Sequence, residues 1–514
     1  MSFPAQYSVG SCQWSVRVVS GRFEFSAELN TQTEECILNT KDWTLGLNAH
    51  DSKLSTDYLN TDVAVIGAGA AGLAAARALH DQNIGVVVLE ARDRIGGRIL
   101  THRDPSTPVP IELGAEFIHG SAPEVEDIVR KASLAAVDIS GRRWQIVGER
   151  LRPADDFWQR LDRVMRRLDE KRTPDRSFES FLSKKPGGRR LAHDRRLALR
   201  YVEGFHAADP ARVSERALAE GGSPGDDVRE RRIGRVLDGY DRVVEWLAAP
   251  LGDRVRLSAI VTRVRWAPGN VSIELRHPDG RSRPSIKARA AIITVPVGVL
   301  QATPGEAGAI EFSPELRAKR PALDHIAMGS VVRIALRFSE SFWSSEWFAK
   351  HAKTEELDTL SFLQTNDEHF QSWWSTYPVR APILVGWHGG PGAGVLLQLA
   401  QEEIEDRAIN SLARQVALPR RKVRGMVEAA WLHDWEHDPF SRGAYSYQTV
   451  GGVDAPAALA RPLRGTLFFA GEAADPEGRT GTVHGAIATG RRAAEEVERS
   501  LTTRSSASRR GASD

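Results

Sequence analysis

Short apolar runs and helical patterns alternate along the chain after residue 60. DVAVIG (62–67) and GVVVLEA (85–91) are short, mostly apolar runs typical of buried strands. Between them, AGLAAARALHDQ (71–82) has the composition of a helix. Because strands joined in a strand–helix–strand order pair in parallel, the pattern predicts an α/β fold with a doubly wound sheet.

The remaining sequence divides into blocks of different character. Residues 122–230 have helical spacing and many charges, whereas RVRLSAIVTRVRWAPGNVSIELR and ARAAIITVPVGVL return to strands. VVRIALRF alternates like a strand, and TLFFAGEAA with AIATGRRAAEEVERSL predicts a strand, a loop and a helix. We expect one nucleotide domain built from residues 61–121, 231–300 and 431–500. A second domain would be inserted as a helical part, 122–230, and a further part, 301–430.

The two ends of the chain lack this alternation. Residues 1–60 form an N-terminal extension in which WSVRVV, SGR and FEFSAEL predict a hairpin, although disorder or an early start codon also fits. Residues 501–514 are small, polar and basic, and we expect a disordered tail. The apolar stretch 64–79 is interrupted by Arg77 and is shorter than the roughly 20 residues of a membrane-spanning helix, so no membrane insertion is predicted.

The composition is that of an ordinary globular protein. Of 514 residues, 41% are hydrophobic and 26% are charged, and the formal net charge is +2. This balance creates no global field that favours nucleic acid or a membrane surface as a partner. The two cysteines, Cys12 and Cys36, exclude a disulfide framework and a cysteine-rich metal site, and no metal site is predicted. We expect a cytoplasmic protein, and a homodimer is compatible with the sequence.

A glycine motif follows the first predicted strand. Gly67, Gly69 and Gly72 form G-x-G-x-x-G, in which the glycines permit a tight turn, close approach of a pyrophosphate and close helix–strand packing. The N–H groups at the start of the helix favour phosphate. Glu90 ends the second strand 23 residues after Gly67, where a carboxylate can accept hydrogen bonds from ribose hydroxyls. A dinucleotide site is therefore predicted.

The segments ARDRIGGRI and IELGAEFIHG after this motif point to a particular dinucleotide. Gly96, Gly97 and Arg98 resemble the second signature of flavoproteins of the amine oxidase superfamily. Four further blocks resemble that family in order over residues 61–500, namely VRLSAIVTRVRW, ITVPVGVL, DWEHDPFSRGAYSY and LFFAGEAADPEGRTGTVHGAIATGRRAAEEV. The chain is thus identified as similar to flavin-containing monoamine and polyamine oxidases.

The resemblance implies a Rossmann-type FAD-binding domain, discontinuous in sequence, with an inserted α+β substrate-binding domain. Val261 matches the position whose backbone meets the adenine, and Glu472 the position near the ribityl chain or phosphates. Glu472 as a helix cap and Thr482 as an ordinary N-terminal hydroxyl are the structural alternatives. The residues expected to hold FAD are Gly67, Gly69, Ala71, Gly72, Glu90, Arg92, Gly97, Arg98, Gly114, Ala115, Glu116, Phe117, Val261, Gly471, Glu472, Thr482 and Val483.

Three departures from the family sharpen these expectations. Ala444 stands where mitochondrial monoamine oxidases carry a cysteine that binds the flavin, so FAD should be bound non-covalently. Tyr445 matches one aromatic residue of the family's substrate cage, whereas Thr482 replaces the second one. Arg333 matches the family lysine that holds a water near flavin N5, and arginine provides no neutral base. In the alternative interpretation, Arg333 and Arg337 both face solvent from one strand.

The loop GAEFIHG bears on the substrate. It resembles the loop that places a histidine over the flavin in acetylpolyamine and spermine oxidases, with His119 at the matching position and Phe117 or Ile118 in the wall. A neutral surface histidine is the alternative for His119. Amino-acid oxidases of the superfamily tend to carry a carboxylate-binding arginine in this loop, and none occurs between Gly114 and Gly120. An amine without a carboxylate is therefore the expected substrate.

The predicted reaction is oxidation of a primary or secondary amine, either a monoamine or a polyamine. A hydride passes to flavin N5, the imine hydrolyses to an aldehyde, and oxygen reoxidises the flavin to give hydrogen peroxide. Arg333, Tyr445, His119 and Thr482 are the candidate catalytic residues. An L-amino-acid oxidase using an arginine of the inserted domain, a flavin dehydrogenase with another electron acceptor and a non-catalytic FAD protein are the alternatives. A histone demethylase is less favoured, because no helical tower or sizeable basic tail is evident.

Overall fold

The computed structural model describes residues 60–147, 150–221, 232–354, 357–365 and 367–510, together with the strands of a small N-terminal unit. The chain divides into two compact units, residues 1–56 and 57–514. In the first, β1 (Ala5–Val9), β2 (Cys12–Val19) and β3 (Arg22–Glu28) form an antiparallel sheet. The pairing of β2 with β3 confirms the predicted hairpin. The remainder of the predicted extension, residues 29–59, lies outside the described residues.

The second unit contains an eight-stranded mixed sheet with the order β13-β5-β4-β16-β15-β14-β17, and β25 also pairs with β16. The two predicted apolar strands, β4 (Asn60–Ile66) and β5 (Val86–Leu89), pair in parallel at its centre. Chain segments far apart in sequence extend the sheet in parallel, since β16 pairs with both β4 and β25. The other strands are β13 (Val255–Arg256), β14 (Ile260–Ala267), β15 (Asn270–Arg276), β16 (Ser282–Ile293), β17 (Glu311–Ser313) and β25 (Leu467–Phe469).

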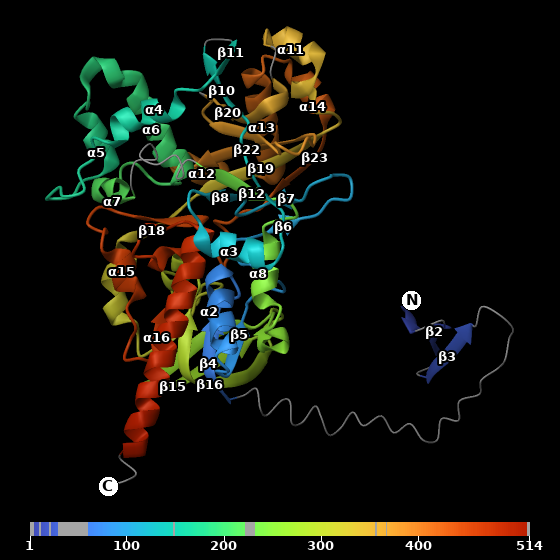
Figure 1. Ribbon diagram of the computed structural model, residues 1–514, viewed down its shortest axis with the longest axis vertical. Coiled ribbons are helices and arrows are strands. Elements are labelled where there is room, and N and C mark those ends of the chain that lie inside the picture. The colour runs from blue at the N-terminus through green and yellow to red at the C-terminus, as the bar shows by residue number, and fades with distance from the viewer. Residues whose placement is uncertain are drawn as a thin grey trace. The chain divides into compact units, whose positions relative to one another are not determined.

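Helices from separate parts of the chain cover one face of this sheet (Figure 1). The helix α2 (Ala70–Asp81) lies beside the long C-terminal helix α16 (Val483–Arg510). Their contact is so close that a Cβ atom added at Gly490 would lie 2.2 Å from the carbonyl oxygen of Ala71. The helices α3 (Pro123–Lys131) and α8 (Asp241–Ala248) complete this layer. The unit also contains the shorter helices α9 (Val297–Leu300), α10 (Arg320–Asp324) and α15 (Ala455–Ala460).

A second, seven-stranded sheet has the order β11-β10-β20-β21-β22-β19-β23. Figure 1 shows helices of two groups around it, α4 to α7 on one side and α11, α13 and α14 on the other. The strands are β10 (Arg142–Val147), β11 (Arg150–Pro153), β19 (Val331–Phe338), β20 (Leu360–Gln364), β21 (Ser372–Ser375), β22 (Ile383–Gly389) and β23 (Val427–Leu432). The helices are α4 (Phe157–Met165), α5 (Phe178–Ser183), α6 (Ala192–Phe205), α7 (Glu215–Glu220), α11 (Glu346–Ala352), α12 (Pro391–Leu396), α13 (Gln401–Gln415) and α14 (Arg420–Met426).

Short strands connect the two large sheets. β8 (Phe117–His119), β12 (Ile233–Val236) and β9 (Ala136–Asp138) form one small sheet, and β18 (Ile326–Gly329) pairs with β24 (Tyr445–Gln448). β6 (Thr101–His102) pairs with β7 (Ile111–Glu112). This arrangement agrees with the predicted fold class, an α/β sheet of parallel centre combined with an α+β second domain.

The structure corrects four details of the predicted organisation. Residues 122–230 are not purely helical, because β10 and β11 join the seven-stranded sheet. The helix α3 also lies in this segment but packs with α8 and α16 of the predicted nucleotide domain, since Val125 and Ile128 belong to the same core. The predicted boundary at residue 300 is too early, because the short strand β17 still pairs with β14.

The predicted disordered tail is the fourth correction. The helix α16 continues to Arg510, and residues 511–514 lie outside the described residues. Leu501 is buried, and the Arg504 side chain donates hydrogen bonds to the carbonyl oxygen of Arg464 and to the Thr466 hydroxyl, both at 2.9 Å. These contacts extend the helix beyond the last residue that the amphipathic pattern covers.

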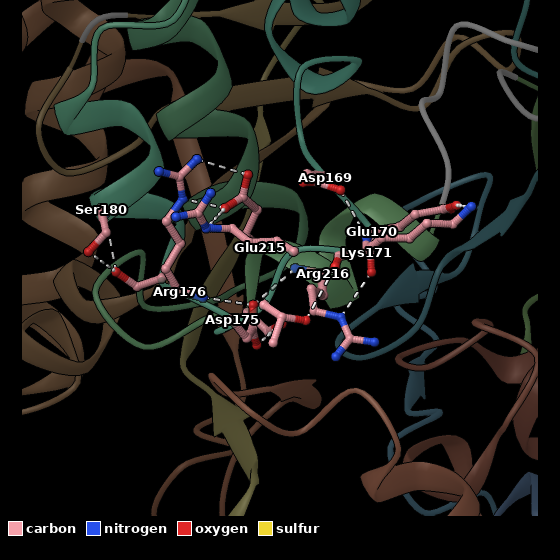
Figure 2. A network of polar contacts seen from close by, with 12 residues as sticks. Asp169, Glu170, Lys171, Asp175, Arg176, Ser180, Glu215 and Arg216 are labelled. Carbon is pink, nitrogen blue, oxygen red and sulfur yellow. Dashed lines mark hydrogen bonds and ion pairs between the residues drawn. The ribbon is translucent and has the colours of Figure 1, made fainter.

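A buried charge network holds the short helix α7 in place (Figure 2). The Glu215 carboxylate is fully buried and pairs with Arg176, while Asp175 accepts hydrogen bonds from the Ser214 hydroxyl and the Gly451 amide at 2.7 and 2.8 Å. Arg216 donates to the carbonyl oxygen of Glu170 at 2.9 Å. The network ties the helical part of the second domain to a loop near residue 450. Among the described residues, none of the helices combines the length and the apolar composition that a membrane-spanning segment needs.

Candidate active site

A large cavity lies where the carboxyl ends of the parallel strands meet the second domain. Its volume is about 1350 Å³, which exceeds a typical pocket for one drug-sized ligand. Ile66, Leu89 and Thr294, at the ends of β4, β5 and β16, line one part of it. Ligands of open α/β sheets bind at this edge. With the exception of Gly72, every residue predicted to hold FAD or to act in catalysis lines the cavity.

Gly72 serves packing rather than ligand contact. A Cβ atom there would lie 1.9 Å from the carbonyl oxygen of Gly67, so only glycine permits this turn between β4 and α2. Gly67 itself has a φ of 109°, in the region that favours glycine. The glycine motif therefore combines a tight turn with a helix that begins at the cavity.

The second glycine loop meets the first one. The Gly96 amide donates to the carbonyl oxygen of Ala68 at 2.8 Å, and a Cβ at Gly97 would lie 3.3 Å from the Cα of Gly69. Glu90 fastens this corner, because its carboxylate accepts the amides of Ala68 and Arg92 at 2.7 and 3.0 Å. Two backbone segments thus approach each other closely along the cavity floor without side chains between them.

Arginines next to the glycine loops are held by distant carboxylates. Arg92 donates to both oxygens of Asp438 at 2.8 Å. Burial opposes ionisation of Asp438, but hydrogen bonds from His433 and Arg92 outweigh it and hold the pKa of this carboxyl well below its usual range. Arg98 donates to Glu472 and to the carbonyl oxygen of Ala444, each at 2.9 Å.

Glu472 and Thr482 both make contacts within the protein. Besides Arg98, the Glu472 carboxylate accepts the Ser446 hydroxyl at 2.7 Å and the Gly481 amide at 2.9 Å. The Thr482 hydroxyl accepts the Gly485 amide at 3.0 Å and so caps the N-terminus of α16. The structure thus bears out the N-terminal hydroxyl described as an alternative for Thr482, while both residues still line the cavity. Their contact with FAD stays a prediction.

Glu116 lies between two arginines at the cavity wall. Its carboxylate accepts a hydrogen bond from Arg235 at 2.5 Å and one from Trp374 at 3.0 Å, and it also pairs with Arg333. Burial opposes its ionisation, but the two arginines outweigh burial and lower the pKa of the Glu116 carboxyl.

The solvent-facing alternative is wrong for Arg333, whose side chain is 5% exposed. The guanidinium lies on β19 and lines the cavity, and its Nη1 atom is buried without a hydrogen-bond partner among the described residues. Arg337, on the same strand, pairs instead with Asp104 at 2.7 Å and with Glu428 at 3.3 Å. Arg333 thus fits the matched family position, although its contact with the flavin stays a prediction.

Aromatic rings form a chamber at the other end of the cavity. His119 lies between Phe117 and Phe205, with ring centroids 5.7 and 5.3 Å away, so it belongs to the cavity wall and not to the outer surface. Phe205 stacks on Tyr201 at 4.9 Å, and the Tyr445 hydroxyl donates to the carbonyl oxygen of Phe205 at 2.8 Å. Burial, with smaller contributions from His484 and Arg143, lowers the pKa of His119 to about 4, which makes the ring neutral at physiological pH.

Sequence reasoning missed the residues that complete this chamber. Phe362 and Trp374 come from β20 and β21 of the second domain, and Arg143 and Trp158 come from β10 and α4. Their segments carry no short motif, and residues 122–230 were expected to be helical. The alternation in RRWQIV was the signal available, because it places Arg143 and Gln145 on one face of a strand.

Comparison with known proteins assigns the family. Residues 70–143 and 143–498 match the family described as flavin containing amine oxidoreductase. Polyamine oxidase 5 of Oryza sativa subsp. japonica is 30% identical over 477 residues, covering 86% of this chain and 88% of that protein. Lysine-specific histone demethylase 2 of Homo sapiens is 26% identical and covers 90% of this chain but 56% of that protein.

Solved structures share the fold. Putrescine oxidase with putrescine bound has a TM-score of 0.70 at 23% identity, covering 85% of this chain and 99% of that one. Cyclohexylamine oxidase from Brevibacterium oxydans IH-35A also has a TM-score of 0.70 at 23% identity, with 86% and 99% covered. The chain belongs to the flavin-containing amine oxidoreductase family. It is a flavin-dependent amine oxidase, an enzyme class that acts on CH–NH or CH–NH2 donors.

The described residues fit a flavin dinucleotide. A Cβ atom at Gly471, whose φ is 136°, would project into open space beside the cavity rather than into protein. The N-terminal ends of α2 and α16 both reach the cavity lining, at Ala70 and Val483. Helix N-termini favour negative charge, so one can face a pyrophosphate and the other the electron-rich edge of a reduced flavin.

Proposed function

We propose that this enzyme binds FAD non-covalently and oxidises a primary or secondary amine at the carbon next to the nitrogen. The observation that carries the proposal is the continuity of one cavity from the glycine cradle at Gly67–Gly97 to the aromatic chamber at His119 and Tyr445. A dinucleotide that is held at the first end can extend its reactive ring toward the second.

The residues that would hold FAD follow from the geometry. The backbone at Gly69, Gly97 and Gly471 would contact the cofactor closely, and Glu90 would meet the ribose hydroxyls of the adenosine. Val261 lines the cavity on β14, where it would contact the adenine. Ala444 provides no thiol, and no cysteine is among the described residues that line the cavity, which supports non-covalent binding.

When bound, FAD would supply the redox chemistry as the acceptor of a substrate hydride at N5 and the donor of electrons to oxygen. In sum, amine, oxygen and water give an aldehyde, ammonia or a shorter amine, and hydrogen peroxide. The chain's own residues orient the substrate and exclude water. Tyr445, fixed by its hydrogen bond to Phe205, would form one wall of the approach path.

His119 and Arg333 have different roles in this proposal. Because His119 is neutral, its ring N–H can donate a hydrogen bond to the substrate nitrogen, and only the unprotonated amine has a lone pair that accepts it. Arg333 stays charged, and its free Nη1 atom can hold a water molecule or the flavin edge. Thr482 orients the start of α16 through its cap and would act through that helix.

A peroxide assay tests the proposal. Purified, FAD-loaded protein should release hydrogen peroxide with members of a panel of monoamines, diamines, polyamines and amino acids, including putrescine and spermidine. The relatives named polyamine oxidase make polyamines the first compounds to examine. Silence across the panel, with FAD bound and no bleaching of the flavin without oxygen, would exclude amine oxidation. A specific observation, the position of Arg143, favours amino acids as a second candidate class.

A further inference from the structure

Arg143 brings a positive charge into the aromatic chamber. It lies on β10, opposite Phe362 of the neighbouring strand β20, and its guanidinium is 4.4 Å from the centroid of that ring. Trp158 and Phe157 of α4 lie 5.2 and 5.5 Å away. Three rings from two elements therefore surround one guanidinium, and Arg143 lines the cavity.

The Arg143 guanidinium has no carboxylate partner among the described residues, and no hydrogen bond from it is found there. Burial lowers its pKa to about 10, so the group is still charged at neutral pH. Cation–π attraction to these rings offsets only part of the cost of burying the charge, since burial still lowers the pKa of Arg143. An anionic ligand in the chamber would remove that cost.

The acidic groups of the cavity are occupied elsewhere. Glu116, Glu472 and Asp475 pair with arginines, and Glu90 accepts two backbone amides. The two other acidic lining residues, Glu220 and Asp454, are exposed to solvent. The chamber around His119 thus contains an unpaired cation and no unpaired carboxylate among the described residues, which disfavours a substrate with a second ammonium group.

We propose that Arg143 binds a carboxylate of the substrate, so that the preferred amine is an amino acid with an apolar or aromatic body. The inference rests on the proposed amine oxidation and specifies its substrate class. The planar guanidinium fork can bind a carboxylate through two hydrogen bonds, which a lysine cannot match. The rings of Phe117, Trp158 and Phe205 would cover the body of such a substrate.

The chemistry is unchanged by this assignment. The amino nitrogen loses a proton and its carbon loses a hydride to FAD, so the substrate becomes an imino acid. Water then replaces the imine nitrogen, which leaves an oxo acid and ammonia, while oxygen is reduced to hydrogen peroxide. Arg143 acts in binding and specificity and takes no part in the transfer.

Matched substrate pairs test the proposal on the FAD-loaded enzyme. Each pair differs by one carboxylate, namely phenylalanine and 2-phenylethylamine, tryptophan and tryptamine, and ornithine and putrescine. The carboxylated member of the aromatic pairs should have the higher kcat/KM. Arg143→Gln should lower kcat/KM for it by about 10- to 100-fold, mostly through KM, with little change for the neutral amine. Arg143→Lys keeps the charge but loses the planar guanidinium fork, so its kcat/KM for the carboxylated substrate should lie between those of the wild type and Arg143→Gln.

Arg196→Gln is the matched control. Arg196 also lines the cavity, but it is exposed and bonds to His193 at 2.7 Å, so its loss removes one positive charge from the same region. Equal effects of the Arg143 and Arg196 variants would overturn the assignment, because they would indicate a general field and not a binding site.

A binding measurement separates this inference from the proposed function. 3-Phenylpropionate has a carboxylate and no amine, and its binding can be followed through the flavin absorbance. Its Kd should rise by about 10- to 100-fold in Arg143→Gln and by less than about threefold in Arg196→Gln. If amines bleach the flavin but carboxylated members are not preferred and this Kd does not change, the inference fails alone. If neither amines nor amino acids bleach the flavin, the proposed function fails. The Kd of 3-phenylpropionate then still decides whether Arg143 binds carboxylates.

Discussion

Glu472 connects segments that lie far apart in the sequence. One carboxylate receives Arg98 from the second glycine loop, Ser446 from β24 and the Gly481 amide before α16. Its family block predicts a site residue at this position, but a motif does not say which oxygen accepts from which donor. Those donors come together only when the sheets and α16 are assembled, so sequence alone could not provide them. The tight turn at Gly67 and Gly72 was predicted more fully, because it depends only on the local sequence of its own segment.

Glu116 allows a test at the level of one side chain. Glu116→Gln keeps the shape but leaves Arg235 and Arg333 buried without their carboxylate. Uncompensated buried charge is costly, so the free energy of unfolding should fall by about 3 kcal/mol, measured by urea denaturation. Glu495→Gln is the control, because its carboxylate is 62% exposed and should contribute less than about 0.5 kcal/mol. If Glu116→Gln lowered the free energy of unfolding by as little as the control, the two arginines would not need this carboxylate as a partner.

At the scale of elements, the apolar strands and the helices next to them followed from the sequence. β4, α2 and β5 lie within a few residues of the predicted blocks. Strands that are buried on both faces give continuous apolar runs, which are easy to recognise in the sequence. β10 and β11 were not predicted, because a short strand with polar residues at alternate positions gives only a weak sequence pattern. Arg143, the residue proposed to bind the substrate carboxylate, lies on β10 and was missed for the same reason.

The crossing of α2 and α16 can be tested by adding one methyl group. In Gly490→Ala the new Cβ would lie 2.2 Å from the carbonyl oxygen of Ala71, so the helices must separate. Overpacking of this kind should lower the free energy of unfolding by about 1–3 kcal/mol and weaken FAD binding, since both helices begin at the cavity.

Gly425→Ala provides the control for this change. Gly425 lies in α14, and no atom would be within 4 Å of the added Cβ. The same substitution should there stabilise the protein by about 0.5–1 kcal/mol, because alanine is the better helix former. If the free energy of unfolding changed with the same sign and size in Gly490→Ala and Gly425→Ala, the close contact between α2 and α16 would be contradicted.

At the scale of the whole molecule, buried titratable groups make stability depend on pH. Burial, with a smaller effect of His369, lowers the pKa of His388 to about 4, and His119 and His206 are shifted to a similar value. Burial raises the pKa of Glu112 to about 7, which has the opposite effect on the slope. Such shifts arise from the assembled fold and could not be predicted from the positions of these residues in the sequence.

The direction in which His388 makes the free energy of unfolding depend on pH follows from proton binding. Between about pH 4 and 6.5 the unfolded chain binds a proton at this residue that the folded protein does not bind, so the free energy of unfolding rises with pH. His388→Asn should reduce that slope by up to about 1.4 kcal/mol per pH unit, and Glu112→Gln should steepen the slope between about pH 4.5 and 7. Urea midpoints at several pH values measure both. Parallel curves for all three proteins would contradict the assigned shifts.

The central claim is that one cavity binds FAD without a covalent bond and presents it to an amine. The most direct measurement is the visible absorbance of natively purified protein, followed by acid denaturation and analysis of the supernatant. We predict a flavin spectrum with about one FAD per chain, all of it released on denaturation. Protein that is colourless and stays so after incubation with excess FAD, or flavin that remains attached to the denatured chain, would contradict the account.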